Sequence, residues 1–329
     1  MNHNTIKWIS SLALGTMLCV SVSAQNAKFQ EGIKYYNNYQ YTAAKACFEE
    51  MAAAGHVAAT YNLGMLYFNG HGVAKNEAKA VEYWQRAAEQ GNLNALNELA
   101  YCYKNGWGGL VADSVKAAEL WLKAADQGHT VAQYNVGYSY LYGDGMPKDE
   151  KKASDYLIKA AVKGDANAQF ELGRLFYNKK EYDLAVENLQ KSADQGDHYA
   201  QTLLGDCYIN GTGVKKNAEE AVKYYRKAAL QGNTDSQYQL GLCYYNGEGI
   251  EKDYNLAYTW FDKAAKKYHS DALYYVALCY EKGHGVKKNR MEALEYYYKA
   301  AGQGHEKAQK KAQKALKKWY NSQKEEGKK

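Results

Sequence analysis

The sequence predicts an all-α fold, an α-solenoid of helix-turn-helix repeats with no sheet. The first observation behind this prediction is a 36-residue stretch, His56 to Gly91, with the pattern of two short helices joined by a glycine-containing loop. The second is that the same pattern returns along most of the 329 residues. A lone helical hairpin cannot cover its own apolar face, whereas stacked neighbours bury it in a continuous core.

Glycines that close each unit define the register of the repeats. They recur at spacings of 32 to 37 residues. The closing positions are Gly55, Gly91, Gly128, Gly164, Gly196, Gly232 and Gly304, with Tyr268 in the same role. We therefore expect one elongated domain over residues 25–304. Its eight hairpins are 25–55, 56–91, 92–128, 129–164, 165–196, 197–232, 233–268 and 269–304.

The first helix of each unit has a recurring order of residue types. It opens with a histidine or a short polar residue, and Asn or Asp there, as at Asn92 and Asp165, is a good N-cap. A small residue such as Ala59 follows three positions later, and then a glycine and an aromatic at the spacing of Gly64 and Tyr67. Small and large residues at helical spacing favour close packing of helix on helix.

Asn-Gly pairs end the first helix in four units, and either residue can adopt the left-handed conformation that ends a helix. The second helix carries an alanine at a fixed point and a large apolar residue four positions later, as at Ala80 and Trp84. This spacing predicts one buried stripe along the second helix. Pro147, the only proline, lies in an expected inter-helix loop, where it interrupts no helix.

The pattern A-x-x-x-L-G-x-x-Y-x-x-G-x-G-V, followed by A-x-x-x-W/Y-x-x-A-A-x-x-G, resembles the Sel-one-like repeat (SLR) family, a relative of the tetratricopeptide repeats. Six units match it: 56–91, 92–128, 129–164, 197–232, 233–268 and 269–304. The unit 165–196 has 12 residues from Gly173 to Ala185, against 16 from Gly205 to Ala221. It and the first unit resemble plain tetratricopeptide repeats. The resemblance implies a right-handed superhelix whose first helices line a concave wall.

Tyrosine is the compositional outlier, with 33 residues against six each of Phe and Trp. Its flat ring and hydroxyl suit recognition of peptides or glycans at little cost in side-chain entropy. By analogy with tetratricopeptide folds, we expect partner-binding residues on the concave face, at positions −3, +1, +4 and +5 from the first-helix glycine. They are Tyr61, Tyr101, Tyr134, Tyr138, Tyr142, Arg174, Tyr177, Tyr238, Tyr245 and Tyr274. Packing between helices is the alternative role for several of them, above all at position −3.

The asparagine at position +5 has two interpretations. It occurs as Asn69, Asn105, Asn178, Asn210 and Asn246. It resembles the backbone-clamping asparagine of tetratricopeptide peptide sites, and it is also a natural C-cap. We favour the cap, because a glycine follows in four of the five units.

Residues 1–24 are expected to be a cleaved secretory signal peptide, and the mature protein to be periplasmic or secreted. Lys7 gives a positive start, about 15 apolar residues follow, and the small residues 22–24 precede the expected cleavage before Gln25. This apolar stretch is shorter than the roughly 20 residues that span a membrane. The alternatives are a retained membrane anchor and a lipoprotein modified at Cys19.

Residues 305–329 differ in charge from the rest of the chain. They hold nine lysines and three glutamates, a net charge of +6, which equals the net charge of the whole chain. One face of an expected helix carries Ala308, Ala312, Ala315, Leu316 and Trp319. We expect a basic capping helix and tail that covers the last repeat. A basic tail that binds an anionic cell-wall or envelope surface or partner is a second, compatible interpretation.

Cysteine and histidine spacings predict no catalytic or metal site, and we expect no cofactor. Cys102, Cys207, Cys243 and Cys279 share one repeat position, too far apart in stacked repeats for disulfides, and are expected to be small buried hydrophobes. The eight histidines show no metal-ligand spacing. The chain has no Cys-x-x-Cys, His-Glu-x-x-His, Gly-x-Ser-x-Gly or Ser-x-x-Lys motif and no phosphate loop. We expect neither an enzyme nor a nucleic-acid partner.

The function expected from these features is an exported, non-catalytic scaffold or adaptor that binds a protein or peptide through its concave face. The observation behind it is a solenoid whose first-helix faces vary. The alternatives are a binder of cell-wall or surface glycans, which would use the tyrosines and lysines, and an enzyme that acts on β-lactams or peptidoglycan. Repeat arrays host many unrelated functions on one frame.

Overall fold

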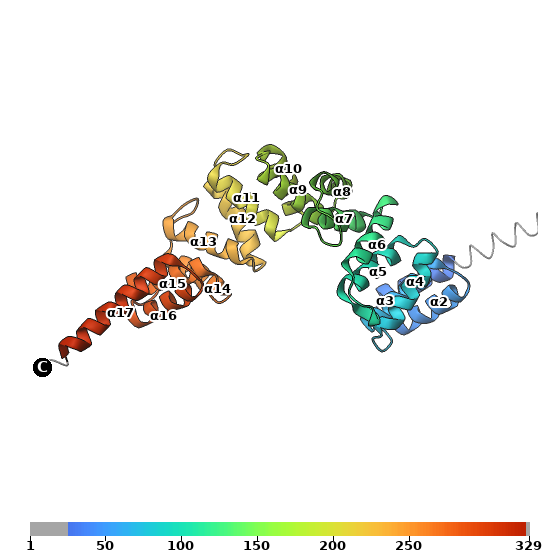
Figure 1. Cartoon of the computed structure of the whole chain (residues 1–329), viewed down its shortest axis with the longest axis horizontal. Helices are drawn as coiled ribbons and strands as arrows, with labels where there is room; N and C mark the ends of the chain where they lie inside the picture. Colours follow the sequence, from blue (N-terminus) through green and yellow to red (C-terminus); the bar gives the residue numbers. More distant parts are fainter. Residues whose placement is uncertain (1–25, 327–329) are drawn as a thin grey trace, which may run out of the picture. The chain divides into compact units, whose positions relative to one another are not determined.

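The computed structural model describes residues 26–326, without the side chains of 316 and 318–326. A helix over residues 26–37 comes first. The labelled helices that follow (Figure 1) are α2 (Tyr41–Ala53), α3 (Val57–Asn69), α4 (Glu77–Glu89), α5 (Leu93–Asn105), the short 3-10 helix η1 (Trp107–Gly109), α6 (Ser114–Asp126), α7 (Thr130–Tyr142), α8 (Glu150–Val162), α9 (Ala166–Asn178), α10 (Tyr182–Asp194), α11 (His198–Asn210), α12 (Ala218–Leu230), α13 (Thr234–Asn246), α14 (Tyr254–Ala265), α15 (Ser270–Lys282), α16 (Arg290–Gly302) and α17 (Glu306–Glu326). No strand occurs in this range, so the predicted all-α class is confirmed. The expected signal peptide lies outside it.

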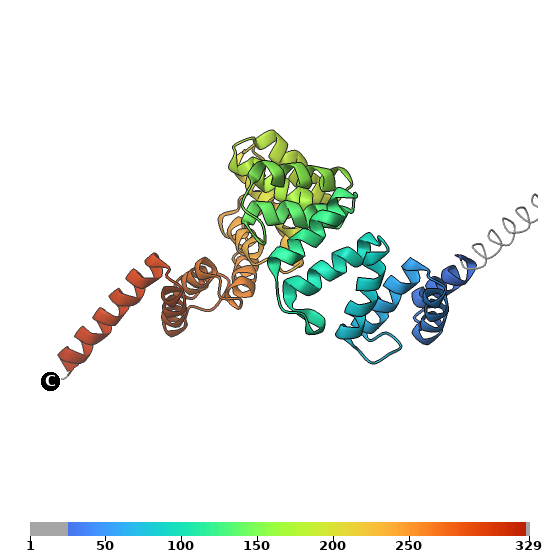
Figure 2. The same ribbon diagram turned by 45° about the vertical axis from the view of Figure 1, so that its right-hand side comes forward.

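The helices form two compact units, of which the first ends at Lys163 and the second begins at Gly164. In the first unit α3 packs on α4, α5 on α6 and α7 on α8, and each hairpin packs on the next. The second unit repeats this arrangement from α9/α10 to α15/α16, and α17 packs on α16. Figure 2 shows the two helices of a hairpin lying side by side. The predicted α-solenoid is confirmed within each unit, although the sequence suggested one elongated domain.

A side-chain N-cap starts every first helix from α3 to α15. Aspartate does so as predicted: the Ala168 N–H donates to Oδ1 of Asp165 at 2.8 Å. Histidine does so too, which the sequence did not predict: the Ala59 N–H donates to Nδ1 of His56 at 3.2 Å. Within residues 26–326, the histidine caps are His56, His129, His269 and His305. Each cap pairs one N–H that the helix itself leaves unpaired.

Two glycines shape the loop of each longer hairpin. The first, such as Gly247 with φ of 75°, is the left-handed C-cap of the first helix. Asn246 is the last helical residue before it, so glycine and not the expected asparagine makes the cap. The second glycine presses on the preceding hairpin: a Cβ at Gly249 would lie 2.2 Å from the Ala218 carbonyl oxygen. The loop therefore joins each hairpin to the one before it by a contact that only glycine permits.

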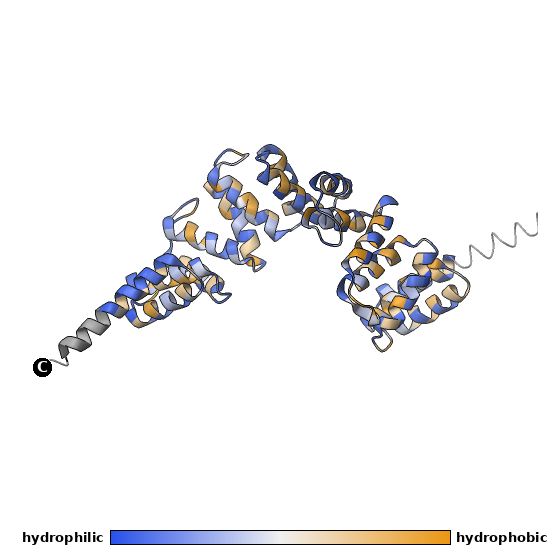
Figure 3. Cartoon of the chain, viewed as in Figure 1, coloured by the Kyte–Doolittle hydropathy of each residue, from blue (hydrophilic) through white to orange (hydrophobic). Residues whose placement is uncertain are grey.

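The first-helix glycine lies directly under the large residue of the second helix. A Cβ at Gly205 would be 2.4 Å from the Tyr225 ring, and one at Gly64 would be 2.4 Å from the indole nitrogen of Trp84. The close packing predicted from residue spacing is thus confirmed. The large residues Trp84, Leu157, Leu189, Tyr225 and Phe261 are at most 1% exposed. Burying each of these side chains stabilises the fold by roughly 1.5–3 kcal/mol. Figure 3 shows apolar and polar residues alternating along the hairpins.

The five cysteines of the described chain are free and buried, which confirms the prediction for the four that share a repeat position. Burial raises the pKa of these four thiols to about 12. A thiol with such a pKa is protonated at neutral pH and is a weak nucleophile. These cysteines therefore act as packing residues of the first helices.

The α9/α10 hairpin lacks the glycine loop, and residues 179–181 alone join its helices. Lys180 has a positive φ of 64°, a conformation that the longer hairpins give to glycine. Glu181 is the N-cap of α10 but makes no side-chain cap hydrogen bond. The short turn thus has neither the second glycine nor a capped second helix.

Helix α17 covers the last hairpin with its alanines. His305 caps it through the Ala308 N–H at 3.1 Å, and Ala308 and Ala312 are 0% and 3% exposed. Ala315 is half-buried, whereas the side chains of Leu316 and Trp319 lie outside the described residues. Within residues 26–326, no helix combines the length and the apolar character needed to cross a membrane.

Candidate functional site

All ten residues predicted on the partner-binding face lie on first helices. The first unit holds Tyr61 (α3), Tyr101 (α5) and Tyr134, Tyr138 and Tyr142 (α7); the second holds Arg174 and Tyr177 (α9), Tyr238 and Tyr245 (α13) and Tyr274 (α15). Tyr138 and Tyr142 are 38% and 37% exposed, and the other eight are half-buried. We call the side of these helices that carries positions −3, +1, +4 and +5 the first-helix face.

Three of the predicted tyrosines form a row along α7. The ring centroids of Tyr134 and Tyr138 are 6.1 Å apart, and those of Tyr138 and Tyr142 are 4.4 Å apart. Residues four apart lie on one side of a helix, which explains the row. This α7 tyrosine row contains the two predicted residues that are exposed, and it offers flat apolar area with hydroxyl groups.

In the second unit Tyr275, which was not predicted, joins three of the predicted tyrosines. Its ring centroid lies 5.8 Å from that of Tyr238, 5.6 Å from that of Tyr245 and 5.7 Å from that of Tyr274. It occupies position −2, and its direct neighbour Tyr274 at −3 was the available signal in the sequence. The four tyrosines form one aromatic cluster on α13 and α15.

Position −3 packs between hairpins, the alternative role stated from the sequence. Tyr238 stacks on His269 with ring centroids 4.8 Å apart, and Tyr274 stacks on His305 with centroids 4.4 Å apart. His269 caps α15 and His305 caps α17, in each case the helix that starts the next layer. Nε2 of His305 lies 3.2 Å from the Asp271 carboxylate. These tyrosines therefore stabilise the junction of two hairpins and expose only part of each ring.

Position +4 contacts the loop of the next hairpin, at the residue after its C-cap glycine. Tyr245 Oη and Nδ1 of His284 are hydrogen-bonded at 3.0 Å. Tyr177 and Thr212 are joined by the same kind of bond. Other hairpins pair Tyr36 with His71, Phe68 with Trp107 and Lys104 with Asp144. We call these contacts the +4 pairs, and they assign Tyr177 and Tyr245 a role between repeats.

Tyr61 and Tyr101 are also engaged with neighbouring helices. The indole N–H of Trp84 donates to the Tyr61 carbonyl oxygen at 3.3 Å, and burial raises the pKa of the Tyr61 hydroxyl to about 12. The Tyr101 hydroxyl donates to Oδ1 of Asn135 at 3.3 Å. Both side chains are therefore only half-buried partners of the packing and not freely exposed.

Arg174 lies beside a buried carboxylate. It donates two hydrogen bonds to Oε2 of Glu171, at 2.8 and 3.2 Å. Burial and the carboxylate of Asp197 raise the pKa of Glu171 to about 7. Glu171 therefore titrates near neutral pH, where most glutamates are fully ionised.

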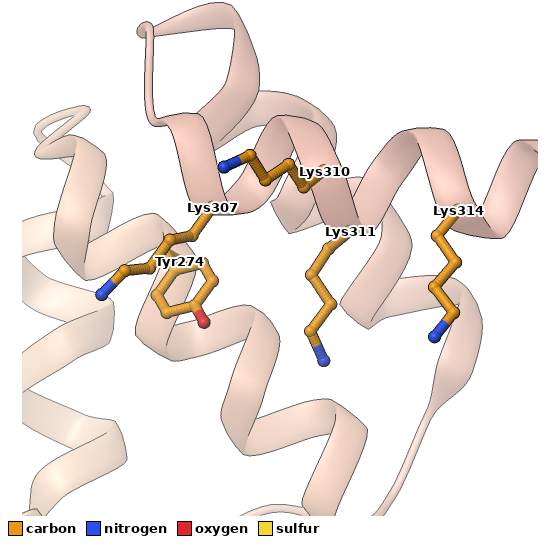
Figure 4. A pocket seen from close by; sticks show the side chains of 5 residues that line it. All are labelled: Tyr274, Lys307, Lys310, Lys311 and Lys314. Carbon is orange, nitrogen blue, oxygen red and sulfur yellow. The ribbon is translucent and has the colours of Figure 1, made fainter.

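The lysines of α17 border a cavity that the sequence did not predict. The cavity has a volume of about 340 Å³, and we call it the lysine pocket. Figure 4 shows the side chains that line it: Tyr274, Lys307, Lys310, Lys311 and Lys314. The ammonium group of Lys311 is held by Glu281, with distances of 2.8 and 2.9 Å. The coloured part of α17 in Figure 3 is predominantly hydrophilic.

Metal-ligating side chains do not gather in the part of the chain that the structure describes, since no group of three or more His, Cys, Asp or Glu occurs there with suitable geometry. Four of the histidines are occupied as helix caps. What the first-helix face offers is aromatic area, hydroxyl groups and ammonium groups, which are groups for recognition.

A family model described as the Sel1 repeat matches seven stretches of the chain: 57–92, 93–129, 130–165, 166–197, 198–233, 234–269 and 270–305. The match to 166–197 corrects the sequence-based interpretation of this shorter unit as a plain tetratricopeptide repeat. The loss of the glycine loop shortens the hairpin, but its core follows the same pattern.

Among solved structures, the chain is similar to a protective antigen of uropathogenic Escherichia coli that displays an SLR fold. The two are 30% identical with a TM-score of 0.80, over 90% of this chain and 66% of that one. A Sel1 repeat protein from Oxalobacter formigenes is 28% identical with a TM-score of 0.64, over 88% of this chain and 86% of that one. An F-box protein of Arabidopsis thaliana is 29% identical over 106 residues, which are 31% of this chain and 32% of that protein. The chain thus spans about a third of that curated relative.

Proposed function

The chain belongs to the Sel1 repeat family, and from this premise we propose that it is an exported, non-catalytic scaffold that holds a protein or peptide partner on its first-helix face. The Sel1 solenoid is a frame typical of protein–protein interaction scaffolds. Stacked repeats place equivalent positions next to one another, which creates extended surfaces suited to extended partners.

One observation carries the proposal, namely that the repeats share a core but differ at an accessible position. Position −5 is a fully buried Ala or Ser in every hairpin from α3/α4 to α15/α16. Position +1 is never buried, and its residues differ in size, polarity and charge: Met65, Tyr101, Tyr138, Arg174, Asp206, Leu242 and Leu278. Varied side chains on a constant frame are what recognition of successive residues of a peptide requires.

The test uses the two exposed tyrosines among the predicted residues. A partner is captured from envelope extract, identified by mass spectrometry and purified, and its affinity is measured against Tyr138→Ala/Tyr142→Ala. Loss of two central aromatic contacts is expected to weaken binding by about tenfold or more. The matched control is Tyr199→Ala/Tyr298→Ala, which removes two tyrosines that are 57% and 44% exposed outside the predicted set. Equal losses in both variants would contradict the proposed face, and thermal melts report any loss of folding.

Export is proposed from the pattern of residues 1–24, which lie outside the described residues. The chain would be expressed in a Gram-negative host, and its mature N-terminus sequenced after cell fractionation. The expected result is a periplasmic or secreted protein that begins at Gln25. A full-length chain in the cytoplasm would refute export, and a membrane-bound chain lipidated at Cys19 would replace it by lipoprotein anchoring.

Binding of cell-wall or surface glycans is the second candidate, supported by the α7 tyrosine row and the lysine pocket. Sedimentation with purified peptidoglycan distinguishes it from protein binding. Pelleting that depends on Tyr138 and Tyr142 favours the glycan, and absence of pelleting favours the protein partner. A nitrocefin assay on the purified chain tests the β-lactam enzyme, for which we expect no turnover.

A further inference from the structure

We propose that the lysine pocket binds an acidic segment of a peptide, and that this segment belongs to the partner held by the scaffold. The proposal rests on the scaffold function and adds to it the place and the chemistry of one contact. The pocket combines Tyr274 of α15 with four lysines of α17. Its location follows from the register of α17 in the array.

Helix α17 is in effect a ninth first helix. Its N-cap His305 stands eight residues before Gln313, as His56 stands eight residues before the first-helix glycine of α3. Lys310 and Lys314 therefore occupy positions −3 and +1, where the preceding hairpins carry tyrosine or other varied residues. The first-helix face thus continues into α17 and changes there from aromatic to cationic.

One of the pocket lysines already binds a carboxylate. The ammonium group of Lys311 and the hydroxyl of Tyr297 both donate to Glu281, and the Tyr297 bond is 2.6 Å long. Among the described residues, no acidic side chain lies within ion-pair distance of the other three pocket lysines, which are Lys307, Lys310 and Lys314. A lysine ammonium group and a tyrosine hydroxyl thus bind one carboxylate together beside the pocket. The pocket contains the same two kinds of group, which can bind an incoming carboxylate.

Two of the pocket lysines extend to the same side of α17. Figure 4 shows Lys311 and Lys314 extending from α17 in the same direction, with Tyr274 beside Lys307, whereas Lys310 runs back along the helix. The cavity of about 340 Å³ is near the lower end of ligand-site volumes. That size suits a few residues of an extended peptide whose neighbours continue along the aromatic cluster.

Charge separation along the chain favours an acidic partner. Residues 25–304 hold 32 Lys and Arg against 33 Asp and Glu, so they are nearly neutral, whereas 305–329 carry a net charge of +6. A localised positive potential of this kind attracts an acidic segment and orients it during association. The partner would then be held at its acidic end in the pocket and by other residues on the first-helix face.

A membrane surface is the less suitable occupant. A helix that lies in a bilayer interface needs an exposed apolar face. Over residues 306–315 the apolar positions of α17 are alanines, of which Ala308 and Ala312 are buried against the preceding hairpin.

The experiment measures the fluorescence anisotropy of a labelled peptide with four consecutive glutamates between glycines and serines, titrated with the full chain. We expect saturable binding that weakens with added salt, because screening shortens the range of charge interactions. Lys307→Gln/Lys310→Gln/Lys314→Gln is expected to weaken binding by about tenfold. The same three lysines changed to arginine keep the charge and are expected to restore binding.

Three controls make the outcome decisive. Lys148→Gln/Lys151→Gln/Lys215→Gln removes the same charge from exposed lysines of other hairpins and is expected to change affinity by less than about twofold. A peptide with glutamines in place of glutamates is expected not to bind. Equal losses in both lysine variants, or displacement of the peptide by anionic phospholipid vesicles at similar concentration, would overturn the proposal. If the captured partner still binds the pocket variant with full affinity, the scaffold function stands and the pocket assignment fails.

Discussion

The α9/α10 and α11/α12 hairpins follow each other in the second unit and differ mainly in the loop between their helices. The longer loop of α11/α12 brings Gly213 onto the start of α10, where a Cβ would lie 2.7 Å from the Tyr182 carbonyl oxygen. The turn 179–181 of α9/α10 contains no equivalent residue. The longer loop thus contacts a second hairpin, and the short turn only connects its own two helices.

The packing inside the two hairpins is nevertheless the same. A Cβ at Gly173 would meet Leu189 at 2.7 Å, and one at Gly205 would meet Tyr225 at 2.4 Å. Helix pairing within a hairpin therefore does not require the glycine loop. The comparison separates two sources of stability, one inside a hairpin and one between hairpins, which substitutions in the two loops can test.

The largest effect is expected at the loop contact. Gly213→Ala combines a positive φ of 70° with a Cβ that overlaps the backbone of Tyr182, and it should cost about 2–3 kcal/mol. Gly196→Ala is the control, because it shares a positive φ of 96° but has no atom within 4 Å of the new Cβ. It should cost only about 1 kcal/mol. Hydrogen exchange of α10–α12 measures both, and equal losses would show that the loop contact adds no stability.

A pH-dependent difference is expected next, at position −2, where α9 has Glu171 and α11 has Leu203. The pKa of Glu171 is raised to about 7 by burial and by Asp197. Because this folded pKa exceeds the unfolded value, the folded state holds its proton more tightly, and stability falls as pH rises from about 5 to about 8.

Glu171→Gln removes this titration and keeps an acceptor for Arg174. Between pH 5 and pH 8, the free energy of unfolding of the wild type is expected to fall by roughly 1–2 kcal/mol more than that of Glu171→Gln. Urea unfolding at each pH, monitored by hydrogen exchange of the α9 amides, measures the difference. Glu187→Gln, at an exposed pair on α10, serves as the control and should match wild type. A flat wild-type profile would contradict the raised pKa.

The caps of the second helices give a smaller contrast. Oδ1 of Asn217 accepts from the Glu220 N–H at 3.1 Å at the start of α12, whereas Glu181 makes no cap bond at α10. Asn217→Ala should therefore cost about 1 kcal/mol, and Glu181→Ala about nothing. Thermal unfolding of the two variants beside wild type provides the measurement. A comparable loss at Glu181 would indicate an interaction of its side chain other than capping.

The smallest effect is expected at Lys180, which holds a positive φ of 64° in the short turn. Lys180→Gly relieves this conformation and should stabilise the chain by about 0.5 kcal/mol after the entropy cost of glycine. Tyr268→Gly repeats the test at a closing position with φ of 61°, where the other hairpins have glycine. A loss of stability in both variants would mean that the native side chains contribute contacts that outweigh the strain.

The hairpins could be predicted from the sequence because their glycines have single physical reasons. A glycine is required where φ is positive, as at Gly247, or where a large ring meets the helix, as at Gly205. These requirements recur at fixed spacing and can therefore be recognised in the amino-acid sequence. The histidine caps were missed because a helix-starting histidine is indistinguishable in sequence from a solvent-exposed one, until Nδ1 of His56 meets the Ala59 N–H.

The candidate binding face was harder to predict than the fold. Tyr245 has the same helical position as a groove residue, yet it bonds to His284 because the next hairpin places that side chain opposite it. The lysine pocket depends on how α17 packs beside Tyr274, a tertiary contact that no spacing rule contains. Tyr138 at position +1 is exposed, and its position on the helix is enough to predict that exposure.

The +4 pairs also give the hairpins an order. Phe68 meets Trp107 through ring contact, whereas Lys104 meets Asp144 through opposite charge. Exchange of α3/α4 with α5/α6, as recombination between similar gene segments would produce, sets Phe68 against a carboxylate and Lys104 against an imidazole. Each junction thus favours one particular hairpin as the next in the chain. Hairpins with nearly identical cores are therefore not interchangeable.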